Sequence, residues 1–242
     1  MRRTILSLIL LPLLFVGASR ADAGGVDLRI GGFFPRGRDC GVLSSQRAEY
    51  TLFQDDCDLY FVEPSDFDGV YGGIEFNQVL TNYVEVGVSY DYYSRTTDTS
   101  YRNYTRPDGG EVQQSLRLRM APLGLTVRLM PTSKKARLVP YIGGGIDAIF
   151  YKYEEYGDFI DFFDPDLAIT PDHFVSESTA FGYHALGGFR AYINRDFAIV
   201  GEGRYQWGKD DMGEDFAPNE PGLVNTIDLS GWSFTVGVHV RF

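Results

Sequence analysis

Gly231-Trp232-Ser233-Phe234-Thr235-Val236-Gly237-Val238-His239-Val240-Arg241-Phe242 is the stretch that decides the fold. Its even positions carry apolar side chains, and its odd positions carry small or polar ones. A period of two is typical of a β-strand with one apolar face and one polar face. The stretch is also about as long as a tilted strand that crosses a bilayer, which takes roughly 9–11 residues. It therefore predicts a membrane-crossing strand that ends on an aromatic residue.

The start of the chain has the features of an export signal. Arg2 and Arg3 precede an almost wholly apolar run from Ile5 to Val16, and Ala21-Asp22-Ala23 fits the small-x-small cleavage pattern. The apolar run is too short to span a membrane, and the order of charge, apolar run and small residues disfavours a buried first helix. We expect residues 1–23 to be a signal peptide cleaved near Ala23, and residues 24–242 to form one β-barrel domain.

The composition of residues 24–242 leaves two fold classes open. These residues contain no apolar run long enough for a membrane helix. The chain is then either a soluble secreted protein or a spanning β-barrel, whose strands alternate in polarity. Over the whole chain, 28 Gly, 16 Tyr and 18 Phe favour β structure, and the net charge of −11 gives no general electrostatic route to nucleic acid.

Eight segments have the alternation of strands. They lie at about 25–34, 67–77, 83–93, 112–129, 138–153, 179–193, 197–207 and 226–242. In the fourth segment the apolar positions change from even to odd at Pro122, which predicts a β-bulge there. The connections alternate between long and short, as in outer-membrane barrels with long outer loops and short periplasmic turns. We expect an interfacial aromatic girdle formed by Tyr90, Tyr92, Tyr93, Phe150, Tyr151, Tyr153, Tyr205 and Trp207.

Three glycine-rich or terminal motifs, together with the signal peptide, carry a family resemblance. They are Pro140-Tyr141-Ile142-Gly143-Gly144-Gly145, His184-Ala185-Leu186-Gly187-Gly188 and the terminal strand. The chain resembles the small outer-membrane barrel proteins of the OmpA-barrel, OmpX and OmpW type. The resemblance implies an all-β fold, an eight-stranded antiparallel transmembrane β-barrel with long extracellular loops and short periplasmic turns. It also implies a place in the cell outer membrane, contact with outer-membrane lipid and lipopolysaccharide, and insertion by barrel-assembly machinery with Phe242 as the barrel-closure and assembly signal.

Charged residues share the polar parity of these strands, and we expect them to form a network in the lumen. An eight-stranded barrel is just wide enough to be filled by side chains, and buried charges need partners. A plug of ion pairs is the first interpretation, and a narrow conduit for small solutes, including hydrophobic ones, is the alternative. A soluble lipocalin-like barrel is disfavoured because the first strand lacks Gly-x-Trp. The expected network is Asp27, Arg29, Glu75, Glu85, Arg117, Arg119, Arg128, Asp147, His184, Arg190, Glu202 and Arg204.

No catalytic constellation stands out in the sequence. A lipid-modifying enzyme would need a Ser/His/acid arrangement, yet His173, His184 and His239 are not followed two residues on by serine. A protease of the omptin type would be expected to have ten strands. We therefore predict no catalytic residues, no cofactor-binding residues and no metal ligands. A lipid-modifying enzyme remains the third interpretation.

The connections between the strands hold the remaining features. Cys40 and Cys57 lie in the first long connection, and an exported chain meets an oxidising compartment, so we expect a disulfide between them. Acidic and aromatic residues fill the later connections, either as solvated charge or as a surface for cations, lipopolysaccharide or a protein. We interpret the protein as an outer-membrane barrel with a structural or surface-interaction role through its loops.

Overall fold

The computed structural model describes residues 24–36, 59–131, 136–162, 164–212, 216 and 226–242. The expected signal peptide and the expected Cys40–Cys57 disulfide lie outside these residues, so both stay predictions. The elements are β1 (Gly24–Pro35), the short 3₁₀ helix η2 (Pro64–Phe67), β2 (Gly69–Val79), β3 (Val84–Thr105), β4 (Glu111–Leu129), β5 (Leu138–Ile160), β6 (Ile169–Tyr192), β7 (Phe197–Asp211), β8 (Thr226–Asp228) and β9 (Gly231–Arg241). Among the described residues, no helix is both long and apolar enough to cross a membrane.

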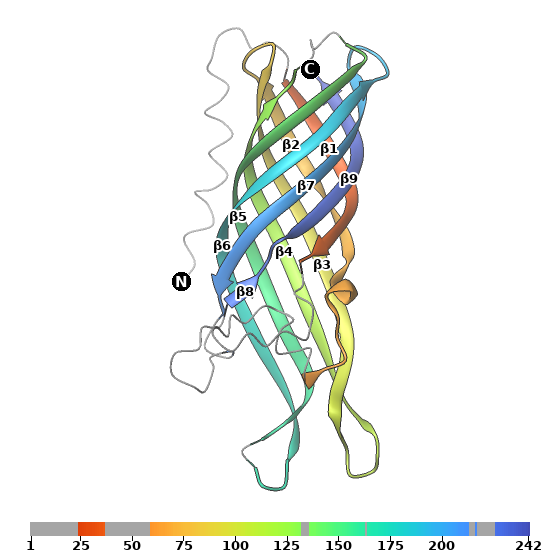
Figure 1. Cartoon of the computed structure of the whole chain (residues 1–242), viewed down its shortest axis with the longest axis vertical. Coiled ribbons are helices and arrows are strands. Elements are labelled where there is room, and N and C mark those ends of the chain that lie inside the picture. The colour runs from red at the N-terminus through yellow and green to blue at the C-terminus, as the bar shows by residue number, and fades with distance from the viewer. Residues whose placement is uncertain (1–23, 37–58, 132–135, 163, 213–215, 217–225) are drawn as a thin grey trace.

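Eight of these strands close into a barrel (Figure 1). Each of β1 to β6 pairs antiparallel with the next strand in the chain, and β9 lies between β7 and β1. Closure is complete because β9 pairs with β1 from Pro35↔Gly231 to Gly25↔Arg241. The predicted eight-stranded antiparallel barrel is confirmed.

The strands extend much farther at one end of the barrel than at the other (Figure 1). Short connections join β2 to β3 and β6 to β7 at the end that also holds Gly24 and Phe242, which we call the turn end. At the other end, the hairpin end, β3 and β4 reach 22 and 19 residues, and β5 and β6 reach 23 and 24 residues, whereas β1, β2 and β9 have 12, 11 and 11. Two long hairpins, β3–β4 and β5–β6, therefore project beyond the rest of the barrel.

Two details of the predicted strands are wrong. The pairing of β4 with β3 and β5 keeps one register through Pro122, so there is no bulge at that residue. The even positions of β4 face inward along its whole length, and it is the polarity of the interior that changes at Pro122. The last predicted strand is also interrupted: β8 pairs only with the end of β7, and Leu229 and Ser230 separate it from β9.

The outer wall of the turn half is apolar. Leu28, Ile142, Phe181 and Val236 each expose about half or more of their surface there, as expected for residues that face lipid. The predicted aromatic girdle is only partly right. Tyr90 and Tyr92 face outward, but Tyr93, Tyr151 and Tyr153 are buried inside the barrel.

The interior has two layers. Charged side chains fill the turn half, as described below. Apolar and aromatic side chains fill the hairpin half and continue into the projecting hairpins: Phe33, Phe67, Tyr71, Tyr93, Tyr101, Leu116, Leu118, Met120, Ile149, Tyr151, Tyr153 and Ile160. We call this second layer the apolar core.

Candidate functional site

The turn half of the lumen is filled by a set of buried charged side chains that we call the polar plug: Asp27, Arg29, Glu75, Glu85, Asp91, Arg128, Asp147, His184, Arg190, Glu202, Arg204 and His239. Ten of the twelve residues expected in the lumen belong to it. Each comes from the inward parity of its strand, so the alternation that exposes apolar residues to lipid also turns these charges inward. Buried charges in such a setting require partners.

Glu202 on β7 is the centre of the plug. Its carboxylate accepts hydrogen bonds from Arg29 Nη1 at 2.6 Å, Arg128 Nη2 at 2.8 Å and Arg204 Nη2 at 3.2 Å. Tyr141 completes the set, because its hydroxyl donates to Glu202 at 3.1 Å and its ring lies 5.1 Å from the Arg128 guanidinium carbon. One carboxylate thus joins four strands across the lumen.

Glu75 and Asp91 balance the same guanidinium groups from the other side. Glu75 Oε2 accepts from Arg128 Nη2 at 2.8 Å and lies 3.0 Å from Arg29 Nη1. Asp91 lies 3.1 Å from Arg29 and 3.4 Å from Arg204. Every guanidinium group in this part of the plug has at least two carboxylate neighbours.

A second group of charges lies nearer the turn end. Arg190 donates to Glu85 at 2.7 Å and to Asp27 at 2.8 Å, and Asp27 also bonds the His239 ring. Asn77 donates to Asp27 at 3.0 Å and accepts from Arg128 at 2.8 Å. Asn77 therefore links this group to the one around Glu202, so these two groups form one connected network.

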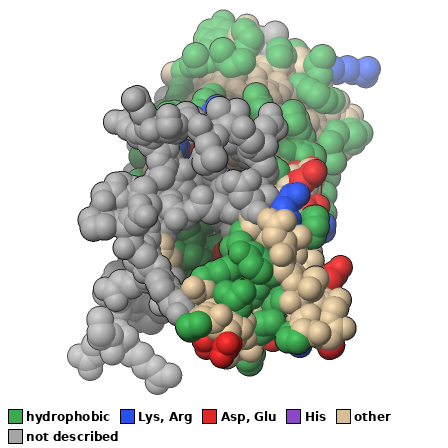
Figure 2. Space-filling model, turned by 60° about the horizontal axis from the view of Figure 1, so that its bottom comes forward, with side chains coloured by type: hydrophobic (Ala, Val, Ile, Leu, Met, Phe, Trp, Pro, Cys, Tyr) green, Lys and Arg blue, Asp and Glu red, His purple; other side chains and the backbone are tan. Residues whose placement is uncertain are grey.

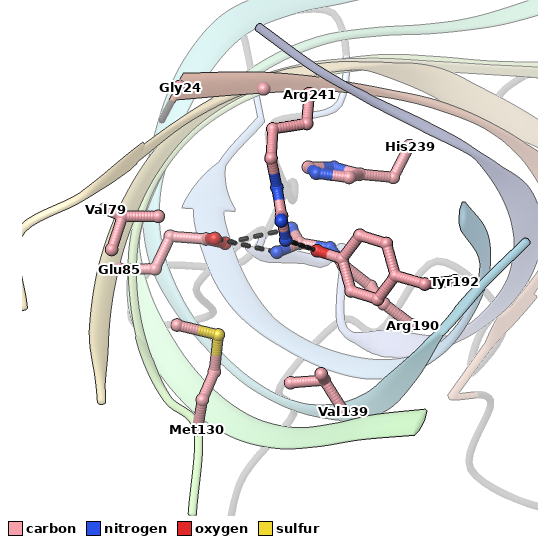
Figure 3. Close-up of a pocket in the computed structure, with 10 residues that line it drawn as sticks. Gly24, Val79, Glu85, Met130, Val139, Arg190, Tyr192, His239 and Arg241 are labelled. Carbon is pink, nitrogen blue, oxygen red and sulfur yellow. Dashed lines mark hydrogen bonds and ion pairs between the residues drawn. The ribbon is translucent and has the colours of Figure 1, made fainter. Parts of the chain in front are cut away.

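Beyond this group, Tyr192 and Arg241 cover the lumen at the turn end (Figure 3). Arg241 donates to the Tyr192 hydroxyl, and its guanidinium carbon lies 4.4 Å from the ring centroid. The pocket beneath has a volume of about 10 Å³, room for about one water molecule. The described residues thus leave little free space between this cover and the charged side chains of the plug.

Thr126, His184 and Asp147 form a hydroxyl–imidazole–carboxylate chain. His184 Nε2 lies 3.0 Å from the Thr126 hydroxyl, and Nδ1 lies 2.8 Å from Asp147 Oδ2. This is the order found in nucleophilic triads. However, Thr126 has no exposed surface and the other two side chains are almost fully buried. A substrate cannot reach the hydroxyl, so the chain acts as part of the plug.

Two inward-facing glycines make room for the carboxylates. A Cβ at Gly124 would lie 2.7 Å from Asp147 Oδ1 and 2.8 Å from the Ser89 hydroxyl, and a Cβ at Gly87 would collide with Glu75 Oε1. Strand glycine often marks such a close approach. The plug thus depends on these missing side chains as well as on its charges.

The placement of Arg117 and Arg119 in the lumen network is wrong. Both lie on the outward face of β4, in the projecting part of the β3–β4 hairpin. Arg119 pairs there with Glu154 of β5, which also lies 2.7 Å from Lys152. The inward positions of this part of β4 are Leu116, Leu118 and Met120 of the apolar core. The sequence prediction failed because beyond the lipid-facing band the polar side chains face water and the apolar ones face inward.

Sequence reasoning left out three members of this site: Asp91, His239 and Tyr141. Asp91 has the same parity as Glu85, and His239 lies on the polar face of the terminal strand, so alternation could have found both. Tyr141 has the same parity as Asp147 on β5, but an aromatic residue in a barrel strand is expected at the lipid interface, so its residue type pointed away from the lumen. Its interior position follows from the two guanidinium groups, Arg128 and Arg190, that pack on its ring.

Above the membrane-facing band, Glu155 on β5 is a buried carboxylate of the hairpin end. Burial raises the pKa of Glu155 to about 7, while a hydrogen bond from the Tyr153 hydroxyl at 2.7 Å opposes that rise. No group of three or more His, Cys, Asp or Glu side chains in the described part of the chain is arranged to hold a metal ion.

The protein resembles known proteins in its fold and not in its sequence. No protein-family model and no curated protein matches this sequence. Among solved structures, the outer membrane protein OprG from Pseudomonas aeruginosa matches with a TM-score of 0.53 at 11% identity, over 93% of this chain and 98% of that one. The chain has the fold of the small eight-stranded outer-membrane barrels.

Two further barrels of this fold align less closely. Neisserial surface protein A matches with a TM-score of 0.48 at 12% identity, over 91% of this chain and 97% of that chain. The outer membrane protein W of E. coli matches with a TM-score of 0.43 at 16% identity, over 93% of this chain and 100% of that chain. The small eight-stranded barrels do not share one activity through their fold, so function has to be argued from the plug and the hairpins of this chain.

Proposed function

We propose that this protein is a closed barrel of the outer membrane that works through the surface of its hairpin end. The observation that carries the proposal is the filled lumen. The polar plug occupies the turn half, the apolar core occupies the hairpin half, and Arg241 and Tyr192 cover the turn end. A solute would have to break several buried ion pairs to pass. The conduit interpretation therefore has less support than the surface role.

The projecting hairpins supply a working surface. Figure 2, with the hairpin end turned forward, shows hydrophobic side chains gathered on it and acidic side chains toward its margins. Phe61, Tyr156 and Phe162 are exposed there, and the Phe162 ring packs 5.3 Å from that of Tyr104. Exposed apolar groups rimmed by charge are typical of interaction surfaces. We infer that this end faces the cell exterior and contacts a surface ligand or neighbouring molecule.

Conductance measurement distinguishes a closed barrel from a conduit. The mature chain, refolded and inserted into planar bilayers, is expected to give no discrete openings under conditions in which a general porin conducts. Regular single-channel steps, or swelling of proteoliposomes in small solutes, would support the conduit and contradict the proposal.

Labelling on intact cells tests the orientation. Asn103 is an exposed residue of the β3–β4 hairpin, and Asn103→Cys is expected to react with a membrane-impermeant maleimide without lysis. The unmodified chain measures any background from Cys40 and Cys57. Labelling that appears only after lysis would show that the hairpins face the periplasm.

A further inference from the structure

A groove runs along the outward wall of the barrel over β6, β7 and β9. It is lined by Arg36, Ala185, Leu186, Gly187, Gly203, Tyr205, Trp207 and Trp232, and its volume is about 470 Å³. That volume falls in the range of ligand pockets, roughly 300–1,000 Å³. The groove opens on the side of the barrel that faces the membrane, so its occupant must come from within the membrane.

Aromatic rings form the wall of the groove. The Trp207 ring stacks on the Tyr183 ring with their centroids 4.9 Å apart. The centroid of the Tyr205 ring lies 4.5 Å from that of Trp207 and 4.9 Å from that of Trp232, both in edge-to-face contacts. Trp232 in turn stacks on Phe234 at 5.8 Å. These contacts fix the rings against one another, so the wall is preformed.

Small residues leave the floor open. Ala185 is exposed, and Gly187 and Gly203 lie opposite each other in the β6–β7 pair. A Cβ at Gly187 would meet nothing closer than 3.8 Å, so packing within the barrel does not require glycine there. The missing side chain instead leaves space on the outer face.

The side chain of Arg36 places a positive charge at the hairpin end of the groove. Arg36 follows β1 directly, and its backbone N–H donates to the Ser230 carbonyl at 2.8 Å, which anchors it beside β9. No carboxylate of the described residues pairs with its guanidinium group. The groove therefore combines an apolar, aromatic body with a positive charge at one end.

We propose that this groove binds one lipid A molecule of the outer leaflet, with an acyl chain on the small-residue floor and a phosphate on Arg36. A chain of methylenes fits an apolar groove, and an anionic phosphate complements the guanidinium, which can bind it through two hydrogen bonds. The hairpin end faces the exterior in the proposed orientation, so Arg36 lies at the leaflet that carries lipopolysaccharide. This inference rests on the proposed orientation of the barrel, and it goes beyond the proposed function because it does not depend on what the hairpins bind or on whether the lumen conducts.

The chain offers a direct readout, because Trp207 and Trp232 are its only two tryptophans and both line the groove. In nanodiscs of phosphatidylcholine with brominated acyl chains, the bromines quench tryptophans that they touch. Purified bisphosphorylated lipid A, titrated into these discs, is expected to displace a brominated chain and restore fluorescence at a low mole fraction. Dephosphorylated lipid A and phosphatidylglycerol serve as the competing lipids.

Variants then assign the effect to the groove. Arg36→Gln is expected to raise the lipid A fraction at half-recovery about tenfold, the effect of losing one charged hydrogen bond. Gly187→Leu is expected to abolish the recovery by filling the floor, and Ala185→Leu replaces it if that variant does not fold. Arg195→Gln at the turn end and Val127→Phe on the opposite wall are the matched controls, with folding checked by unboiled gel mobility.

Several results would overturn the proposed lipid A site. Equal recovery with phosphatidylglycerol or with dephosphorylated lipid A would overturn the assignment to lipid A. An unchanged titration in both Arg36→Gln and the groove-filling variant would overturn the site itself, as would recovery that accompanies dimer formation on native gels. Conductance of the barrel has no bearing on these readings, so the two proposals fail separately.

Discussion

Replacing Glu202 by glutamine tests whether the polar plug holds the barrel together. The variant keeps the shape of the side chain and removes the charge that Arg29, Arg128 and Arg204 share. Removing one partner of a buried ion pair costs about 3–5 kcal/mol. Arg29, Arg128 and Arg204 each retain another carboxylate neighbour, Glu75 or Asp91. We therefore expect a loss near the lower limit, about 3 kcal/mol of unfolding free energy.

The assay is denaturant unfolding of the refolded barrel in lipid vesicles, followed by tryptophan fluorescence. Glu177→Gln is the matched control, because it removes the same charge from an exposed position on the outer face of β6. A surface change of this kind is expected to stay within about 0.5 kcal/mol. The difference between the two variants then isolates the cost of burial.

Equal stability of the two variants would refute the reasoning. It would show that water reaches Glu202, since a hydrated charge loses little when its partners change. A more stable Glu202→Gln barrel would show that the plug carries an excess of negative charge in the lumen.

Four further predictions concern other parts of the chain. Deleting Phe242, whose N–H donates to the Gly24 carbonyl at 3.0 Å where β9 meets β1, should lower the folded outer-membrane fraction seen by unboiled gel mobility. Val86→Arg, on the outward face, should cost about 2–4 kcal/mol in the same vesicle assay; labelling that placed Val86 in the lumen would reverse the parity. The double variant Cys40→Ser with Cys57→Ser should remove a disulfide that stabilises its loop by roughly 3 kcal/mol. Insertion should stay intact, and added protease should cut the loop more easily. Titratable thiols in the native protein would exclude the bond. Burial raises the pKa of Glu155 to about 7 from 4.5, so its contribution to hairpin stability is full below pH 4.5 and is lost as the pH rises to about 7. The protection of β5 amides against hydrogen exchange, corrected for the intrinsic pH dependence of exchange, should fall over that range, and Glu155→Gln should remove this fall.

Alternation, the connection lengths and the family resemblance together predicted the barrel, and alternation predicted most of the plug. In the turn half, lipid on one side and a narrow lumen on the other enforce opposite polarity at neighbouring residues, as at Glu85 and Val86 or at Arg128 and Val127. Strand identity, parity and the inward charges all follow from that single constraint. The partners of each charge did not follow, because contacts across the lumen depend on the register and tilt of strands far apart in the chain.

The inward and outward faces of the hairpin half could not be predicted from the same alternation. There the outer surface meets water, so the outward face carries Arg117 and Lys152, while the inward face carries Leu116 and Tyr153. The polarity of both faces inverts without any change in backbone register. A pattern that assumed lipid outside therefore placed Arg117 in the lumen and ended the strands too early.

Accessibility of Ser89 tests the central claim that the lumen is closed. Ser89 lies inside the plug with 1% of its surface exposed, and its hydroxyl is 3.5 Å from Arg204. Ser89→Cys is nearly isosteric, so it should leave the plug intact, and the modification rate of this thiol by a small charged methanethiosulfonate can be compared with that of exposed Asn103→Cys. A closed lumen predicts no modification of Ser89→Cys from either side until the barrel is unfolded. Modification at a rate approaching that of Asn103→Cys would contradict the account and show a water-filled passage.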